Sequence, residues 1–140
     1  MRAVTTILGT TLLALFVPAT AAAGPTRQCV DQSEALVGQR ARLVDKTFAA
    51  PRKLTSRPFD FPTRPGATKA SGVWVGEALV DTAGKVRQAW TIRSFNFEPA
   101  WPEFDDAVIS GIRSWTYEPA VVDGAAVPVC VTVSVNIDWR

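Results

Sequence analysis

Residues 129–139 alternate between apolar and polar side chains, and this pattern constrains the fold more than any other part of the chain. The apolar members are Val129, Val131, Val133, Val135, Ile137 and Trp139, and the polar members are Cys130, Thr132, Ser134, Asn136 and Asp138. Successive side chains of a β-strand point to opposite faces, so the pattern predicts one long strand with an apolar face and a polar face. Because this strand stands at the end of the sequence, we expect one of its edges to lack a covering strand.

An uncovered edge offers unpaired backbone N–H and C=O groups to a strand of another protein. We therefore expect this edge, rather than a catalytic centre, to carry the function. A Val133→Pro change is expected to remove a backbone donor from it and to abolish the capture of a partner peptide. The alternative is an ordinary edge strand that is blunted by Asp138 and by a disulfide at Cys130.

The first 23 residues have the pattern of a secretory signal peptide. Arg2 is followed by an uncharged stretch whose most apolar part runs over residues 7–17, and small residues end it at 21–23. The alternative is an uncleaved membrane anchor, although the continuous apolar run is closer in length to that of a signal peptide. The sequence thus predicts a periplasmic protein, or alternatively an inner-membrane anchored protein that faces the periplasm. Contact with the membrane is expected only if residues 1–23 stay uncleaved.

Charge and composition exclude several classes of function. Removal of residues 1–23 takes away one of the 15 basic residues, Arg2, which leaves 14 against 13 acidic residues. Such a chain lacks the basic surface that nucleic-acid binding requires, so we expect no nucleic-acid partner. The chain has no histidine, which excludes Ser-His-Asp and Cys-His catalytic sites and histidine-based zinc sites. Asp105 and Asp106 do not face each other on a helix, and we predict no enzyme, no metal and no cofactor.

The two cysteines of the chain, Cys29 and Cys130, are expected to form a disulfide in an exported protein. Two free thiols are the alternative that the sequence leaves open. Since Cys130 belongs to the polar face of its strand, a disulfide would hold the N-terminal part of the chain against or beside that face.

Residues 24–50 are predicted to form a helical arm, with a helix over about 32–47. Asp31 and Glu34 have the spacing of a capping box, and apolar residues then recur at helical spacing. Residues 51–71 form a basic linker whose four prolines forbid a regular helix. Two interpretations of this linker stay open, namely a solvated connector or a segment that contacts lipid headgroups or an acidic protein.

Residues 72–140 are predicted to form the folded domain. A strand over 73–81, a tight turn and a return strand over 85–93 form a hairpin, and a helix over 102–115 precedes the final strand. The expected fold class is α+β, a three-stranded antiparallel sheet (β-hairpin, helix, β) with one packed helix, together with an N-terminal helix tethered by the disulfide. Trp101, which precedes the helix, is expected to be the most exposed of the five tryptophans.

Residues 72–139 contain several short segments that together form a recognisable pattern. They are Gly72-Val73-Trp74-Val75, Val80-Asp81-Thr82-Ala83-Gly84-Lys85-Val86, Ser94, Phe104-Asp105-Asp106-Ala107, Arg113-Ser114-Trp115-Thr116-Tyr117-Glu118-Pro119-Ala120 and Asp123-Gly124. With these segments the region resembles the C-terminal domain of the TonB family of periplasmic energy transducers.

The resemblance implies a module that binds an extended segment of an outer-membrane TonB-dependent transporter, or of another envelope protein, by β-strand addition. It implies partner contacts at Val131, Thr132, Val133, Ser134, Val135 and Asn136, and at Tyr117, Glu118 and Pro119. The family's transducers also carry a functional histidine in an uncleaved N-terminal helix and a long Pro-rich spacer, whereas this chain has no histidine and a short Pro-containing stretch. We therefore expect the binding module of such a transducer without its energy-harvesting part. The alternative is a small exported structural protein that forms a homodimer through the same edge strand.

Overall fold

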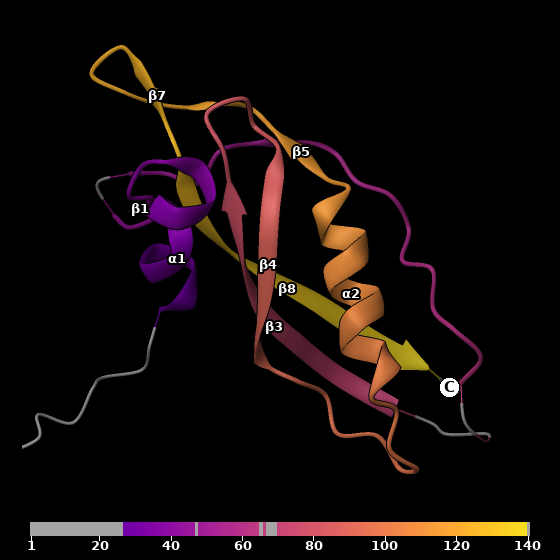
Figure 1. Ribbon diagram of the computed structural model, residues 1–140. Helices are drawn as coiled ribbons and strands as arrows, with labels where there is room; N and C mark the ends of the chain where they lie inside the picture. Colours follow the sequence, from indigo (N-terminus) through magenta and orange to yellow (C-terminus); the bar gives the residue numbers. More distant parts are fainter. Residues whose placement is uncertain (1–26, 47, 65, 67–69, 140) are drawn as a thin grey trace, which may run out of the picture.

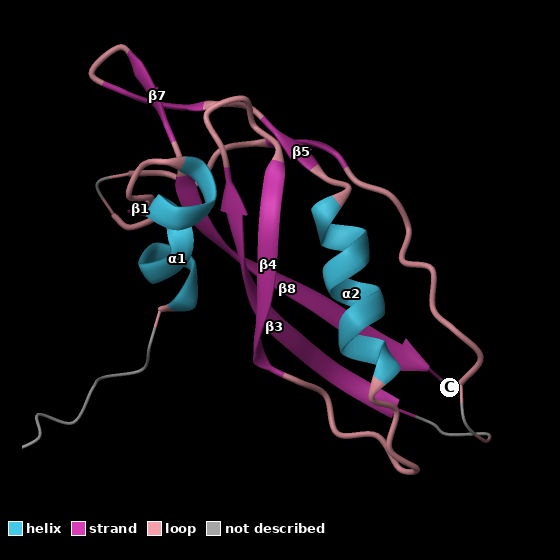
Figure 2. Ribbon diagram, viewed as in Figure 1, coloured by secondary structure: helices cyan, strands magenta, loops and turns pink. Residues whose placement is uncertain are grey.

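The computed structural model describes residues 27–46, 48–64, 66 and 70–139, and the predicted signal peptide lies outside them. Within these residues the protein has an α+β fold with two helices and three small sheets (Figures 1 and 2). This confirms the predicted class. The arrangement of the strands differs from the expectation.

The first helix, α1 (Gln28–Val37), is shorter than predicted and starts earlier. Asp31 lies in its first turn and does not cap it, so the capping-box prediction was wrong. The helix ends because Gly38 adopts a left-handed conformation (φ 74°), with its N–H donating to the carbonyl of Glu34. The predicted helix over 32–47 was therefore wrong beyond Val37, since the chain turns there and continues into a strand.

The main sheet has four strands in the order β1-β8-β3-β4. The long strands β3 (Ala70–Val80) and β8 (Val129–Trp139) are antiparallel and pair along their whole length. The hairpin partner β4 (Val86–Arg93) follows β3, and β1 (Arg42–Leu43) runs parallel to the start of β8. The sheet is thus mixed and four-stranded, and the expectation of three antiparallel strands was wrong. The cause is the early end of α1, which frees the next residues to join the sheet.

The second helix, α2 (Glu103–Arg113), covers one face of this sheet (Figure 2). It begins after Pro102 and carries three acidic residues in its first turn, where the helix dipole favours negative charge. Phe104, Val108 and Ile112 form the apolar stripe that packs on the sheet. The indole of Trp74 is fully buried beneath the helix, and its Nε1 donates a hydrogen bond of 3.0 Å to Asp105 Oδ1.

Two short ribbons flank the main sheet. The first consists of β2 (Lys53–Thr55) and β5 (Thr116–Tyr117), and the second of β6 (Ala120–Val122) and β7 (Ala125–Val127). Gly84, in the β3–β4 turn, has φ +81°, and a Cβ atom there would lie 2.0 Å from the carbonyl oxygen of Tyr117. Only glycine therefore allows the hairpin to contact β5 so closely.

The disulfide between Cys29 and Cys130 is present, which confirms the predicted pairing. It joins residues 101 positions apart and links α1 to the beginning of β8. Around it lies a second, smaller apolar cluster that includes Val30, Ala41 and Leu79. As expected, the arm is held at the face of the sheet to which the polar side chains of β8 point.

Trp101 is only 6% exposed, so the expectation of an exposed indole was wrong. The ring packs against Phe61, Phe97, Phe104 and Trp139 at centroid distances of 5.3–5.9 Å. The burial arises because residues distant in the sequence converge at this end of α2.

Candidate functional site

The outer edge of β8 is the main candidate for a functional surface. On that side β1 pairs with Val129 and Cys130 alone, and no other strand of the described chain pairs with it (Figure 1). On its inner side β8 is paired with β3 from end to end. Residues 131–136, the contact positions implied by the resemblance, thus have a strand on one side and none on the other.

The hydrogen bonds of β1 show which backbone groups of this edge point outward. Arg42 N–H donates to the carbonyl of Pro128, so residue 128 faces β1. Along a strand the N–H and C=O groups of successive residues point alternately to the two neighbours, and the β3–β8 register is unbroken. The outward groups between 131 and 136 are therefore those of Thr132, Ser134 and Asn136.

The same alternation shows that Val133 is not a suitable position for testing the open edge. Its N–H points toward β3, and its side chain is buried with 6% exposure. A proline there would break the β3–β8 ladder and disturb the core, so it would not test the edge. Ser134 is the matched position with an outward N–H and an exposed side chain.

A groove with a volume of 460 Å³ lies along this edge. Its walls are the backbone and side chains of β8 and the segment that follows β2, and its lining residues are Lys53, Ser56, Arg57, Pro58, Phe59, Trp115, Ser134, Val135 and Asn136. We call residues 56–64 the strap. In Figure 1 the strap is the magenta segment that runs along α2 toward the C-terminus.

Aromatic contacts hold the strap on the core. Phe59 packs on Trp115 with ring centroids 5.7 Å apart, and Phe61 stacks on Phe104 at 5.2 Å. Phe61 also meets the ring of Trp139 edge-on at 5.4 Å. Among the described residues no hydrogen bond links the strap to the outward groups of Thr132, Ser134 or Asn136. The strap is thus fastened through side chains, and the strand edge keeps its hydrogen-bonding capacity.

The groove is positively charged. Lys53 and Arg57 line it, no acidic residue does, and the Nζ atom of Lys53 lies 3.9 Å from the centre of the Trp115 ring. Farther along the strap, the guanidinium of Arg64 lies 5.5 Å from the centre of the Trp139 ring. Such cations favour an acidic binding partner by electrostatic complementarity.

Tyr117, Glu118 and Pro119 are not brought to the groove. Tyr117 is buried in β5, where burial raises the pKa of its hydroxyl, and Glu118 accepts a hydrogen bond from Arg52. That bond lowers the pKa of Glu118, and it ties β5 to the segment before β2. The groove is instead lined by Lys53, Arg57 and Phe59. In the sequence these residues belong to a basic extended segment that also contains aromatic residues.

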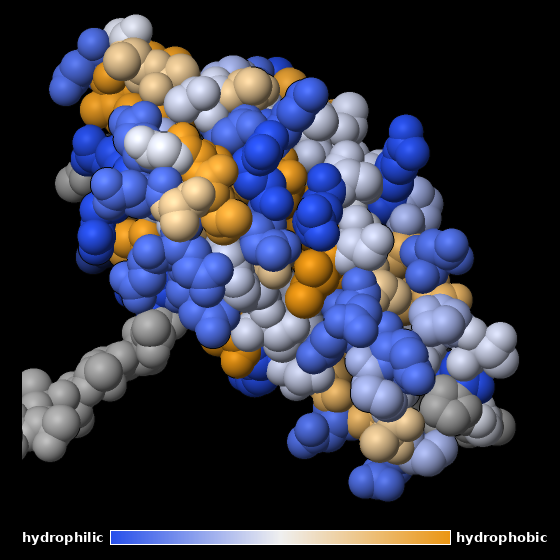
Figure 3. All heavy atoms as spheres, viewed as in Figure 1, coloured by the Kyte–Doolittle hydropathy of each residue, from blue (hydrophilic) through white to orange (hydrophobic). Residues whose placement is uncertain are grey.

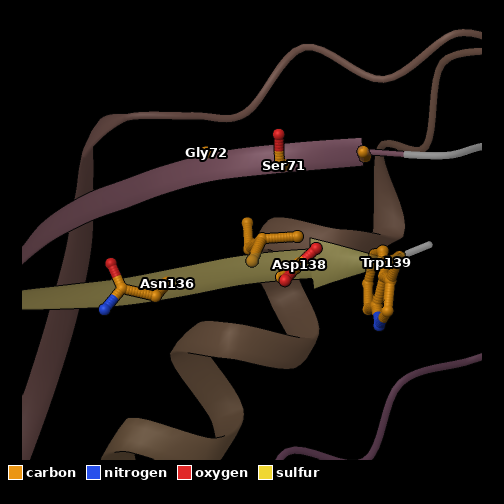
Figure 4. Close-up of a pocket in the computed structure, with 7 residues that line it drawn as sticks. Ser71, Gly72, Asn136, Asp138 and Trp139 are labelled. Carbon is orange, nitrogen blue, oxygen red and sulfur yellow. The ribbon is translucent and has the colours of Figure 1, made fainter.

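A further hollow of 610 Å³ opens at the ends of β3 and β8 (Figure 4). The close-up shows the side chains of Ser71 and Asn136 on one face of the strands and Trp139 on the other. Asn136 lines both this hollow and the groove. The hollow therefore lies over the paired ends of β3 and β8 and adjoins the groove at Asn136.

The view in Figure 3 shows hydrophilic side chains over most of one face of the protein, with small separate apolar patches. One patch covers the β6–β7 hairpin, where Val121 is exposed. Scattered apolar residues of this kind are normal on a surface. This face therefore offers no large apolar patch that would compete with the strand edge as a docking surface.

Comparison with known proteins assigns no family, since neither a protein family model nor a curated protein matches the chain. Within the described part of the chain, neither helix has the length and apolar character needed to span a bilayer. The disulfide is consistent with an oxidising compartment reached by export.

The strap offers a direct test of its anchoring. A Phe61→Ala change should lower the free energy of unfolding by about 2–3 kcal/mol, less than full burial of a phenylalanine would predict. It should also increase cleavage by chymotrypsin after Phe59 severalfold, because the strap loses its contact with Phe104. Leu54→Ala, at an exposed position nearby, is the matched control. Equal cleavage of the two variants would contradict anchoring by Phe61.

Proposed function

We propose that the protein is an exported interaction module that binds an extended segment of another envelope protein by β-strand addition. The observation that carries this proposal is the edge of β8, which is paired with β1 only at Val129 and Cys130. Strand addition uses such an edge for main-chain hydrogen bonds and uses neighbouring pockets for selectivity. The resemblance to the TonB C-terminal domain supports an outer-membrane TonB-dependent transporter as the partner.

The incoming segment would extend the main sheet beside β8. It would exchange hydrogen bonds with the outward groups of Thr132, Ser134 and Asn136. Because β1 occupies the first two of the 11 positions of β8, the remaining length suits a segment of up to about nine residues at the usual rise per residue. The binding needs no chemistry, and we assign the protein a role in recognition rather than catalysis.

The groove gives the segment a preferred composition. Lys53 and Arg57 favour carboxylates in the partner. Val135, which is half-buried, together with Phe59 and Trp115 favours an apolar side chain between them. We therefore expect an acidic segment with at least one apolar residue.

A Ser134→Pro change tests strand addition. It removes the N–H donor at the centre of the open edge, and proline is tolerated in a strand where the N–H faces solvent. The affinity for an extended acidic peptide of alternating valine and threonine should fall roughly tenfold or more, because a peptide carbonyl loses its donor. Calorimetric titration with this peptide and with its lysine-flanked counterpart gives both the affinity and the charge preference.

Two variants serve as controls for this experiment. Ser134→Ala keeps the backbone donor and should bind as the parent does. Val133→Pro should lower stability as well as binding, because its N–H belongs to the β3–β8 ladder. If Ser134→Pro retains its fold and binds the peptide as tightly as Ser134→Ala, strand addition at this edge is rejected.

The same edge also suits a second copy of the chain, which is the structural alternative. A homodimer through β8 would bury the outward groups of Thr132, Ser134 and Asn136 between two protomers. Sedimentation of the parent over a range of concentrations separates the two functions. Self-association that Ser134→Pro abolishes, with no peptide binding, would favour the dimer.

A further inference from the structure

A hollow of 400 Å³ lies where the C-terminal end of α2 meets the start of β4 and the strand β5. We call it the basic hollow, and its lining residues are Lys85, Val86, Arg87, Arg113, Ser114, Trp115 and Thr116. Its volume is within the range of small-ligand sites, roughly 300–1,000 Å³.

Three cations from three different elements converge on the basic hollow. Lys85 lies at the end of the β3–β4 turn, Arg87 in β4 and Arg113 in the last turn of α2. No acidic side chain is among the lining residues. Among the described residues no ion pair engages Lys85 or Arg113. The positive charge is therefore largely uncompensated by the protein.

Asp81, the acidic residue within ion-pair distance of one of these cations, has another role. Asp81 Oδ1 accepts hydrogen bonds of 2.9 Å from the N–H groups of Ala83 and Lys85, which shape the turn. Its Oδ2 lies 3.9 Å from a guanidinium nitrogen of Arg87, at the limit of an ion pair. Because Arg87 is exposed, this contact contributes little and leaves the guanidinium able to bind another anion.

A hydroxyl donor faces the same region. Thr116 Oγ1 and Thr55 Oγ1 are 2.6 Å apart, and either can donate to the other. One O–H is used in this bond and the second remains free to donate. Lys85 forms a β-bridge with Thr116, and side chains of residues paired in this way share a face. When Thr55 is the donor of this bond, the O–H of Thr116 is left to donate to an oxyanion beside Lys85.

The carbonyl groups at the C-terminal end of α2 disfavour the binding of an anion nearby, since this end of a helix carries partial negative charge. Here they are partly satisfied. Ser114 donates to the carbonyl of Gly111 through both its N–H and its hydroxyl, at 3.1 and 2.6 Å, and Trp115 N–H donates to Ile112 at 3.0 Å. Three full positive charges outweigh the remaining partial charge.

We propose that the basic hollow binds a phosphate group, supplied by a soluble phosphate or by the headgroup of an anionic phospholipid. A phosphate carries more charge and more acceptor oxygens than a carboxylate, and arginine binds it in a forked geometry. The hollow shares only Trp115 with the groove at the β8 edge, so the inference is independent of strand addition.

The test uses inorganic pyrophosphate as the soluble probe and vesicles of phosphatidylglycerol as the lipid probe. Arg113→Ala and Lys85→Ala should each weaken the binding of whichever probe the parent binds by roughly fivefold, as expected for loss of one solvent-exposed charged contact. Arg40→Ala removes one positive charge from an exposed site outside the hollow and is the matched control. Amide chemical shifts in an NMR titration locate the bound pyrophosphate.

The outcomes separate the sources of phosphate. Pyrophosphate binding that Arg113→Ala weakens supports a soluble ligand, and vesicle binding that it weakens without pyrophosphate binding supports a headgroup. Absence of binding to both probes by the folded parent overturns the proposal. So does an equal loss of affinity in Arg40→Ala, because net charge alone would then explain the binding. Ser134→Pro should bind either probe as the parent does, which separates this test from that of strand addition.

Discussion

Replacing Trp74 by alanine is expected to lower the free energy of unfolding by about 3–5 kcal/mol, the usual cost of removing a large buried aromatic side chain. The indole is fully buried between β3 and α2, where the collapse of surrounding side chains cannot fill its volume. The change also deprives Asp105 of the Nε1 donor. Since small domains are stable by only about 5–15 kcal/mol, this loss would leave the fold marginal.

Urea unfolding followed by circular dichroism measures this effect. Trp74→Phe is the matched control, because it keeps an aromatic ring and removes the hydrogen bond to Asp105. It should cost much less than alanine. If the alanine variant unfolds at the same urea concentration as the phenylalanine variant, packing of the Trp74 ring is not the main contribution to the core.

Removal of the disulfide has the second large effect. Cys29 and Cys130 are 101 positions apart. A cross-link closing a loop of about 100 residues stabilises a protein by roughly 4–5 kcal/mol through the entropy of the unfolded chain. The double Cys29→Ala and Cys130→Ala variant should therefore unfold at a much lower urea concentration than the oxidised parent. Reduction of the parent with dithiothreitol should give nearly the same curve.

Hydrogen exchange would locate the consequence within the structure. Without the cross-link, the contacts of α1 among the described residues are the small cluster around Val30, Ala41 and Leu79 and the hydrogen bond from Ala41 N–H to Ser33 Oγ. Its amides should lose protection before those of β3 and β8, which share a full-length ladder. Unchanged protection of α1 after reduction would show that packing, rather than the disulfide, holds the arm in place.

The elements that the sequence predicted well are those with a strong local signal. The alternation over 129–139 corresponds to β8, and the apolar stripe through Phe104, Val108 and Ile112 corresponds to α2. The β3–β4 hairpin and the cysteine pairing were also correct. In each case neighbouring residues, or the small number of cysteines, carry the information.

The errors concern features in which distant segments meet. The sequence did not indicate that α1 ends at Gly38, and therefore the prediction lacked β1, the fourth strand of the main sheet. Trp101 was expected to be exposed because its local sequence does not reveal the rings of Phe61 and Trp139. The strap looked like a linker, because the prolines that exclude a helix do not indicate that Phe59 and Phe61 pack on the core.

For the candidate site, the amino-acid order by itself determined that β8 exists, which of its side chains face the core and that its cysteine is cross-linked. Only the tertiary structure decided which backbone groups remain open and what surrounds them. Those groups depend on the register of β8 with β1 and β3 and on the path of the strap. Side-chain alternation is a property of one strand, whereas the availability of a strand edge is a property of all the segments that pack around it.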